Sequence, residues 1–313
     1  MNRLIITNGS AAADAIAATG IEGELLSWND VLHDGPVPAR LSLVELSEVR
    51  AHYISSLGWG ESNGVLAEFV ARDTMLKTAP TRDEVICWFE HDLYDQLQLW
   101  QVLDALGSMN VSVKLICRDA FIGHQSSTQL KEDFEARKEV SRARFAAAST
   151  LWSAFRHTDP DLLVRKQGAG LNFTTSTISR WAQCFPSTSI GLNRSEKFTL
   201  EYLNGHAGSA SFGDLFRALL AQEEAAFMGD TSLFVVLSRL SSFEPSLIRL
   251  RGDKASLPAV KIKLTDAGRN RLKGGGWSWD SASDRWIGGV HLKKSNQWLW
   301  NPESREMERR AEE

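Results

Sequence analysis

The chain has 313 residues, of which 43% are hydrophobic and 24% are charged, and its formal net charge is −4 at pH 7. This length exceeds what one ordinary hydrophobic core supports and predicts two domains. No apolar stretch reaches the roughly 20 residues that cross a bilayer, and the apolar run at residues 4–7 is too short for a signal peptide, so we expect a cytoplasmic protein with no membrane partner.

The first 77 residues alternate strand-like and helix-like patterns. Residues 4–7 predict a strand, which the turn Asn8-Gly9-Ser10 joins to an alanine-rich helix ending near Gly20. Residues 24–28 predict a second strand, followed by a loop at 29–38 that contains a glycine and two prolines. Helices are expected at 42–57, where Ser42 and Glu45 form a capping box, and at 63–77.

An almost continuous apolar run at residues 85–89 is typical of a parallel strand that is buried on both faces. A helix at 94–106 and a strand at 111–117 follow it. This order predicts, for residues 1–125, an α/β domain with a mostly parallel, Rossmann-like sheet and helices on both faces.

The rest of the chain has a different texture. Residues 126–190 predict a helical connector, and residues 191–303 predict three helices, a hairpin around Gly252-Asp253 and a further helix, which is the order of a winged-helix-like α+β domain. The tail of this domain is expected to form strands rich in tryptophan, and residues 304–313 are expected to be disordered because they are highly charged. The tail tryptophans are Trp277, Trp279, Trp286, Trp298 and Trp300.

Several motifs, read in order, resemble a bacterial family known as domain of unknown function 1835. They are ITNGS, WNDVLHDGP, WFEHDLYDQLQL, GLNRSE, EEAAFMGD, LTDAGR and RWIGGVHL, and they span nearly the whole chain. The resemblance implies a shared architecture but no activity, because none is assigned to the family and a fold does not fix a function.

The turn Asn8-Gly9-Ser10 connects the first strand to the first helix. Free amide groups and the positive end of a helix dipole can hold a phosphate there, although a simple turn with a helix cap explains the same residues. Neither a Rossmann glycine fingerprint nor a P-loop motif occurs in the chain. We therefore expect an anion at this turn because of its position in the sheet, more than because of its sequence.

The loop after the second strand combines Asp30, His33, Asp34 and Gly35. Histidine beside a carboxylate can transfer protons near neutral pH, so we expect His33 to take a ligand or catalytic role, with Asp30 or Asp34 orienting it. The structural alternative is that Asp30 caps a turn and His33 bonds to the backbone.

The densest polar cluster follows the strand at residues 85–89. One of His91 and Asp92 should point into the crevice beyond the strand end, although Asp92 also suits the cap of the next helix. His33 and His91 with a carboxylate could also bind a divalent metal, but no HxH, HExxH or DxD spacing involves these residues, so a metal site is not predicted. The cluster comprises Glu90, His91, Asp92, Asp95 and Gln96.

The helix at residues 231–243 occupies the position of a recognition helix, but Arg239 is its only basic residue. Such a helix is suited to burial, so a protein partner is favoured over DNA for the second domain.

The leading hypothesis is a protein that binds a small anionic ligand, a nucleotide or phosphoester, at the carboxyl edge of the first sheet. Whether it is an enzyme stays open; an enzyme would be a hydrolase or transferase acting on a phosphate-containing molecule through its histidines. The alternatives are a non-enzymatic ligand sensor that contacts a protein or DNA, and a scaffold. No cofactor is identified. The predicted catalytic residues are His33, His91, Asp30 and Asp92, and the predicted ligand-binding residues are Asn8, Gly9, Ser10, Asp34, Gly35, Glu90, Asp95 and Gln96.

Overall fold

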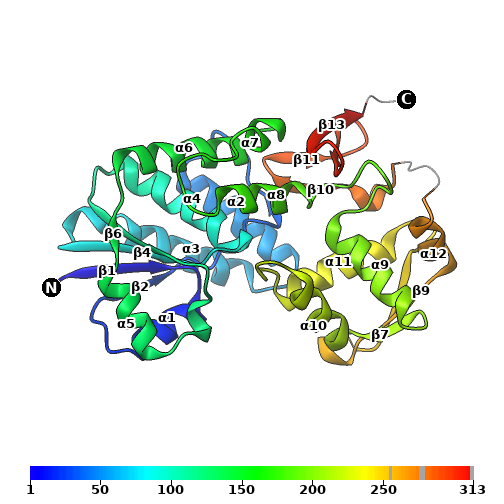
Figure 1. Ribbon diagram of the computed structural model, residues 1–313, viewed down its shortest axis with the longest axis horizontal. Coiled ribbons are helices and arrows are strands. Elements are labelled where there is room, and N and C mark those ends of the chain that lie inside the picture. The colour runs from blue at the N-terminus through cyan, green and yellow to red at the C-terminus, as the bar shows by residue number, and fades with distance from the viewer. Residues whose placement is uncertain (254–255, 275–278, 311–313) are drawn as a thin grey trace. The chain divides into compact units, whose positions relative to one another are not determined.

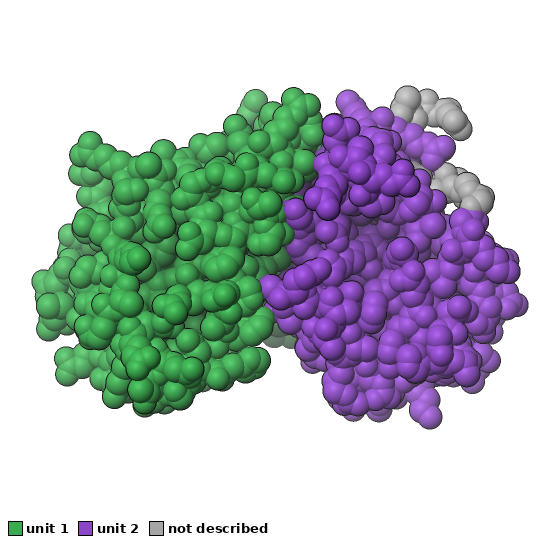
Figure 2. Space-filling view, viewed as in Figure 1, with its two compact units in different colours: residues 1–178, 288–290 green, residues 179–287, 291–313 purple. Residues whose placement is uncertain are grey.

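A computed structural model describes residues 1–253, 256–274 and 279–310 (Figure 1). The chain forms two compact units, coloured separately in Figure 2. Unit 1 comprises residues 1–178 and 288–290, and unit 2 comprises residues 179–287 and 291–313. None of the helices in the described part of the chain combines the length and hydrophobicity of a transmembrane segment.

Unit 1 is built on a five-stranded sheet with the order β2-β1-β4-β5-β6. Four of its strands are parallel, and only the short edge strand β6 pairs antiparallel. Every residue of β4 is buried, as its unbroken apolar run predicts. The mostly parallel sheet expected from the sequence is therefore confirmed. The strands of unit 1 are β1 (Arg3–Thr7), β2 (Glu24–Ser27), β3 (Gly35–Pro36), β4 (Glu84–Phe89), β5 (Val113–Cys117) and β6 (Lys138–Glu139).

Helices cover both faces of this sheet, as predicted (Figure 1). On one face, Ile16 of α1 and Phe134 of α5 pack with Ile5, Ile86 and Ile116 of three neighbouring strands. On the other face, α4 lies against α6. The helices are α1 (Ser10–Ala17), α2 (Leu43–Ser56), α3 (Ser62–Leu76), α4 (Leu93–Ser108), α5 (Ser127–Glu135), α6 (Arg142–Phe155), α7 (Asp161–Val164) and α8 (Thr174–Ala182), with 3₁₀ turns η1 (Ala79–Thr81) and η2 (Ile122–His124).

The helical connector consists of α5 to α8, but the two units divide inside α8 and not near residue 190. Residues 288–290 also return to unit 1, where the Gly289 amide donates to the Phe155 carbonyl at 3.0 Å. A side chain at Gly289 would collide with the Arg156 carbonyl, so this close approach of two backbones requires glycine. Local sequence patterns carry no signal for such a distant pairing.

Unit 2 has the winged-helix-like order predicted from the sequence, with one additional strand. Helix α9 (Arg194–Gly205) is followed by β7 (Ser209–Ser211), then by α10 (Phe212–Gln222) and α11 (Asp230–Ser242). The hairpin β8 (Ile248–Arg251) and β9 (Lys261–Leu264) joins β7 in an antiparallel sheet of order β7-β9-β8. The helices enclose a single core with Leu200, Leu215, Leu237 and Ile262. The remaining elements near the hairpin are η3 (Leu257–Ala259), α12 (Asp266–Leu272) and η4 (Ser281–Ser283).

The tail contains the expected strands, namely β10 (Arg285–Gly288), β11 (Val290–Leu292) and β12 (Gln297–Asn301). The expectation of disorder from residue 304 is wrong for β13 (Glu306–Arg310), which pairs antiparallel with β12. In this register Met307 lies opposite Trp300, and both are buried. The burial of Met307 and the pairing with β12 thus stabilise a strand here despite its charged sequence. Trp277 and residues 311–313 lie outside the described residues.

Candidate functional site

The polar residues singled out in unit 1 follow the ends of parallel strands, so they belong to the carboxyl edge of one sheet. Asn8 follows β1, the loop of His33 follows β2, and Glu90 follows β4. Two contacts connect the middle of this edge: Asn8 Nδ2 donates to Asp95 Oδ2 at 2.8 Å, and the Tyr94 hydroxyl donates to the Asn8 carbonyl at 3.2 Å. The start of α4 is thereby tied to the end of β1.

Glu90, Asp92 and Asp95 form a buried carboxylate cluster, in which one oxygen from each residue lies within 4.8 Å of the others. Neutral donors hold these groups in place. Asp95 Oδ1 accepts from the Glu90 amide at 2.6 Å, Asp92 Oδ1 caps α4 by accepting from the Asp95 amide at 3.1 Å, and Glu90 Oε1 accepts from the Ile122 amide at 2.7 Å. No lysine or arginine in the described part of the chain forms an ion pair with any of the three.

Burial dominates the electrostatics of the carboxylate cluster. Burial raises the pKa of Asp92 to about 7, with a further contribution from the Glu90 charge. Burial also raises the pKa of Asp95 well above its ordinary value, assisted by the charges of Asp92 and Glu90, and it raises the pKa of Glu90. At neutral pH the cluster therefore favours taking up a proton or a metal cation.

Two glutamine side chains on α4 add polar atoms beneath this edge. Gln96 Nε2 donates to the Glu90 carbonyl at 2.6 Å, and Gln98 Nε2 donates to the Asp30 carbonyl at 3.0 Å. Both side chains are fully buried, yet the Oε1 atom of each lacks a hydrogen-bond partner among the described residues. Because buried polar atoms are nearly always satisfied, each of these oxygens has room for a donor, Gln96 beside Glu90 and Gln98 beside Asp30.

Helix α1 begins directly at the end of β1 and has no side-chain cap. Gly9 is its N-cap residue, with an extended backbone (φ −168°) that any residue can adopt. The Ser10 hydroxyl accepts from Asn29 Nδ2 at 3.2 Å, and a Cβ on Gly9 would lie 3.2 Å from Asn29 Oδ1. Glycine at position 9 therefore leaves room for the Asn29 side chain, and it is not required by the backbone conformation.

Asp30 has a structural environment that differs from the predicted catalytic one. Its carboxylate is fully buried and forms an ion pair with Arg50, whose Nε donates to Oδ1 at 2.9 Å. The Arg50 guanidinium also donates to the carbonyls of Asp34 and Val31, at 2.6 and 2.8 Å. The pair therefore holds the loop in shape, and the orienting role of Asp30 toward His33 stays a prediction.

His33 lies in the same loop and contacts Tyr94 edge-on, with 6.0 Å between ring centroids. Its Nε2 is 3.8 Å from Asp34 Oδ2, which is ion-pair range but too long for a hydrogen bond. Gly35 has φ +79°, and a Cβ there would collide with the ring of Tyr53. The glycine thus fixes the shape of the loop, and its role in ligand binding stays a prediction.

His91 packs between two aromatic rings, Phe121 at 5.1 Å and Phe173 at 5.8 Å. Burial lowers its pKa, and the nearby Asp119 carboxylate opposes this effect. Its Nδ1 is buried and lacks a hydrogen-bond partner among the described residues. Burial thus favours the neutral imidazole of His91, which is the form that a general base needs.

Sequence reasoning missed Arg50, Tyr94 and Gln98. A signal for Arg50 existed: it falls midway between Leu46 and Ile54 at spacings of four residues, so it lies on the buried stripe of α2. A cation on a buried stripe implies a buried carboxylate partner. Nothing comparable marks Tyr94, whose contact with Asn8 depends on how α4 sits against β1.

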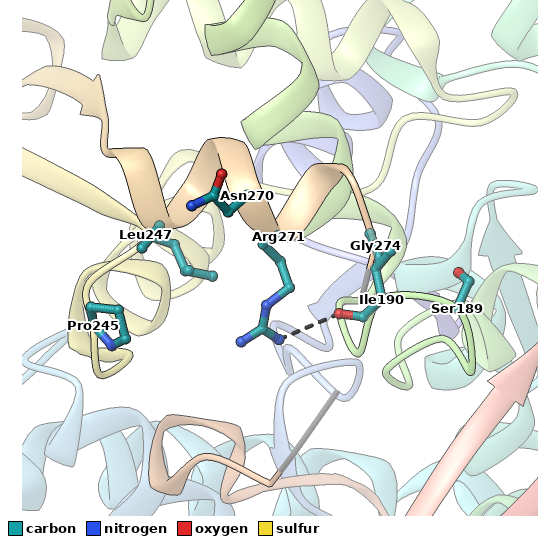
Figure 3. Close-up of a pocket in the computed structure, with 8 residues that line it drawn as sticks. Ser189, Ile190, Pro245, Leu247, Asn270, Arg271 and Gly274 are labelled. Atoms are coloured by element: carbon teal, nitrogen blue, oxygen red, sulfur yellow. Dashed lines mark hydrogen bonds between the residues drawn. The ribbon is translucent and has the colours of Figure 1, made fainter. Parts of the chain in front are cut away.

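Described residues of unit 2 line at least two pockets, and no sequence-predicted site residue lines these two. In the first, of about 280 Å³, Arg271 Nη1 donates to the Ile190 carbonyl at 3.3 Å, next to Leu247 and Asn270 (Figure 3). The second, of about 500 Å³, is lined by residues of α8 and α9 and by Trp300. Neither pocket gathers the acid and base groups that the carboxyl edge of unit 1 combines.

Comparisons with known proteins do not assign the chain to a family. No family model matches the chain, and no curated protein matches it. Among solved structures, the Orc1 protein of Aeropyrum pernix in complex with DNA has 12% identity and a TM-score of 0.22, covering 87% of this chain and 85% of its own. Cdc6p of Pyrobaculum aerophilum has 11% identity and a TM-score of 0.20, covering 87% and 86%. Likenesses this low carry no argument about function.

Proposed function

We propose that unit 1 binds a small phosphate-containing molecule, a nucleotide or phosphoester, together with a divalent cation, at the carboxyl edge of its parallel sheet. The observation that carries the proposal is the 2.8 Å contact between Asn8 and Asp95. It places the uncapped start of α1, which suits an anion, directly beside a carboxylate cluster, which suits a cation.

The cation follows from the charge of the cluster. Three buried carboxylates that form no ion pair with a described lysine or arginine would repel a phosphate, whereas a bound cation removes this repulsion and attracts phosphate oxygens. Carboxylate oxygens are the ligands that Mg²⁺ and Mn²⁺ prefer, and Mg²⁺ is commonly held by one or two carboxylates plus substrate phosphates. We assign Glu90, Asp92 and Asp95 as the protein ligands.

The phosphate site follows from the start of α1. The first amides of a helix have no partner within the helix, and here no side chain caps them. These amides and the positive end of the helix dipole together favour an anion. Asn8 and Gly9 shape this turn, and Ser10 offers a hydroxyl beside it.

Thermal unfolding with ADP, with Mg²⁺ and with both tests this proposal. A ligand at 100 times its dissociation constant adds about 2.7 kcal/mol to the free energy of unfolding. We expect ADP with Mg²⁺ to raise the melting temperature more than the sum of the two alone. Asp95→Asn should abolish this gain, and Asp14→Asn, on the exposed face of α1, should leave it intact. Equal shifts in both variants, or no shift in the natural protein, would refute the proposed site.

A catalytic role is a second candidate, and it is favoured by the lowered pKa of His91 and by its buried Nδ1, which has no hydrogen-bond partner among the described residues. In this role His91 removes a proton from the attacking group, in a hydrolase or transferase reaction on the bound phosphate compound. General base catalysis contributes about 10²- to 10⁴-fold, so His91→Gln should lower turnover by that factor while preserving Mg²⁺-ADP binding. Loss of binding instead of turnover would contradict this role.

Three predictions from the sequence stay predictions: membership of the family of domain of unknown function 1835, a cytoplasmic location, and a catalytic or ligand role for His33.

A further inference from the structure

The hairpin of unit 2 presents four basic side chains in register. In the antiparallel pairing of β8 with β9, Arg249 lies opposite Lys263 and Arg251 lies opposite Lys261. All four side chains are exposed, whereas the residues that alternate with them face the core, Ile262 and Leu264 being fully buried or nearly so. We call these four residues the basic hairpin face.

The basic hairpin face is electrostatically unfavourable by itself. Like charges directly opposite each other destabilise a strand pair. Other arginines of unit 2 have carboxylate partners, for example Arg180 with Glu223 and Arg239 with Glu196. Within the described residues, no carboxylate lies within 4.0 Å of any member of the basic hairpin face. Four aligned cations without a counterion indicate a polyanionic partner.

We infer that the basic hairpin face binds the phosphate backbone of duplex DNA. The third strand of this sheet, β7, places Ser209 opposite Lys263 and Ser211 opposite Lys261. The exposed Ser209 hydroxyl therefore joins the four cations, and such groups are usual side-chain donors to phosphate, whereas the Ser211 hydroxyl already donates to Asp214 Oδ2 at 2.6 Å. A protein partner fits less well, because the centres of protein interfaces are apolar and depleted in lysine.

Binding should be independent of DNA sequence. Base reading needs polar side chains that reach base edges from a recognition helix. The only basic residue of α11, Arg239, is instead engaged with Glu196 at 2.9 Å. The half-buried residues Phe234 and Val235 of α11 are apolar and cannot form hydrogen bonds to base edges. This inference concerns unit 2 alone and does not depend on the ligand proposed for unit 1.

Fluorescence anisotropy of a short labelled duplex, with the full chain and no added nucleotide, tests the inference. With four phosphate contacts, the logarithm of the association constant should fall against the logarithm of salt concentration with a slope of about −3.6, or about 150-fold between roughly 50 and 200 mM salt. A duplex of scrambled sequence should bind equally.

The matched variants are Lys261→Gln/Lys263→Gln and, as the control, Lys293→Gln/Lys294→Gln, two exposed lysines elsewhere in unit 2. The first should weaken binding and reduce the slope by about 2. The control should bind as the natural protein does. Equal effects of the two variants, absence of binding at low salt, or binding to phosphatidylserine vesicles but not to the duplex would overturn the inference. Circular dichroism spectra that match the natural protein establish that both variants are folded.

Discussion

Replacing Arg50 by alanine should destabilise unit 1 strongly, because it removes the close ion-pair partner of the buried Asp30 carboxylate and leaves only Arg72, at 3.9 Å from Asp30 Oδ2. The side chains of Arg50 and Asp30 are both fully buried, and the guanidinium donates to the Asp30 carboxylate and to the loop carbonyls of Asp34 and Val31. Breaking a buried ion pair from one side costs about 3–5 kcal/mol. We therefore expect Arg50→Ala to lower the free energy of unfolding by that amount.

Urea unfolding followed by circular dichroism measures this loss. Arg165→Ala is the control, because its partner Asp161 lies one helical turn away and the arginine is 74% exposed, so the change should cost under about 1 kcal/mol. The double variant Asp30→Asn/Arg50→Met should lose less than Arg50→Ala, since no buried charge is left unpaired. A loss for Arg50→Ala no greater than the control's would refute the structural role of the pair.

Two further changes test the shape and the charge of the candidate site. Gly35→Ala should lower the melting temperature of unit 1, because the residue has φ +79° and its new methyl group would meet the Tyr53 ring; unchanged melting would show that the loop adapts. Asp92→Asn keeps a helix cap but cannot titrate, and the folded-state pKa of Asp92 is raised from 3.8 to about 7. Protonation therefore stabilises the natural protein fully below about pH 4, and this contribution is lost as pH rises through 7, so its stability relative to Asp92→Asn should fall across that window in urea titrations. A constant difference would mean that Asp92 is not perturbed.

The sequence predicted the fold well where local patterns decide it. The apolar run of β4 and the helix that follows it specify a buried parallel strand, and the order of α9, α10, α11 and the hairpin specifies the second unit. Strand β7 is three residues long and is defined only by its pairing with β9, so no local period reveals it. Strand β13 was missed for a similar reason, because its charged sequence becomes a strand only against β12.

The sequence predicted where the candidate site lies, but it did not predict what each of its residues does. The parallel order of the strands was enough to place Asn8, His33 and Glu90 at one edge of a sheet. Roles depend on partners distant in the sequence. Asp30 was assigned to catalysis because it is close to His33 in the chain, whereas its partner is Arg50 on α2.

The carboxylate cluster is a second feature that sequence patterns did not predict. A metal site was considered only for His33 and His91 with a carboxylate, and Glu90, Asp92 and Asp95 were not weighed as a ligand set because they match no familiar ligand spacing. The bend from strand β4 into helix α4 brings their oxygens together all the same. Spacing rules that assume a continuous helix or strand fail at such a junction.

Titration with Mn²⁺, followed by electron paramagnetic resonance of the free ion, tests the central claim most directly. The account predicts one bound ion per chain, an apparent affinity that rises with pH because the carboxylates must lose their protons, and tighter binding when ADP is present. Glu90→Gln and Asp95→Asn should each remove the bound ion, whereas Asp14→Asn should not. A natural protein that leaves all Mn²⁺ free both with and without ADP, or that binds it equally well after Asp95→Asn, would contradict the account.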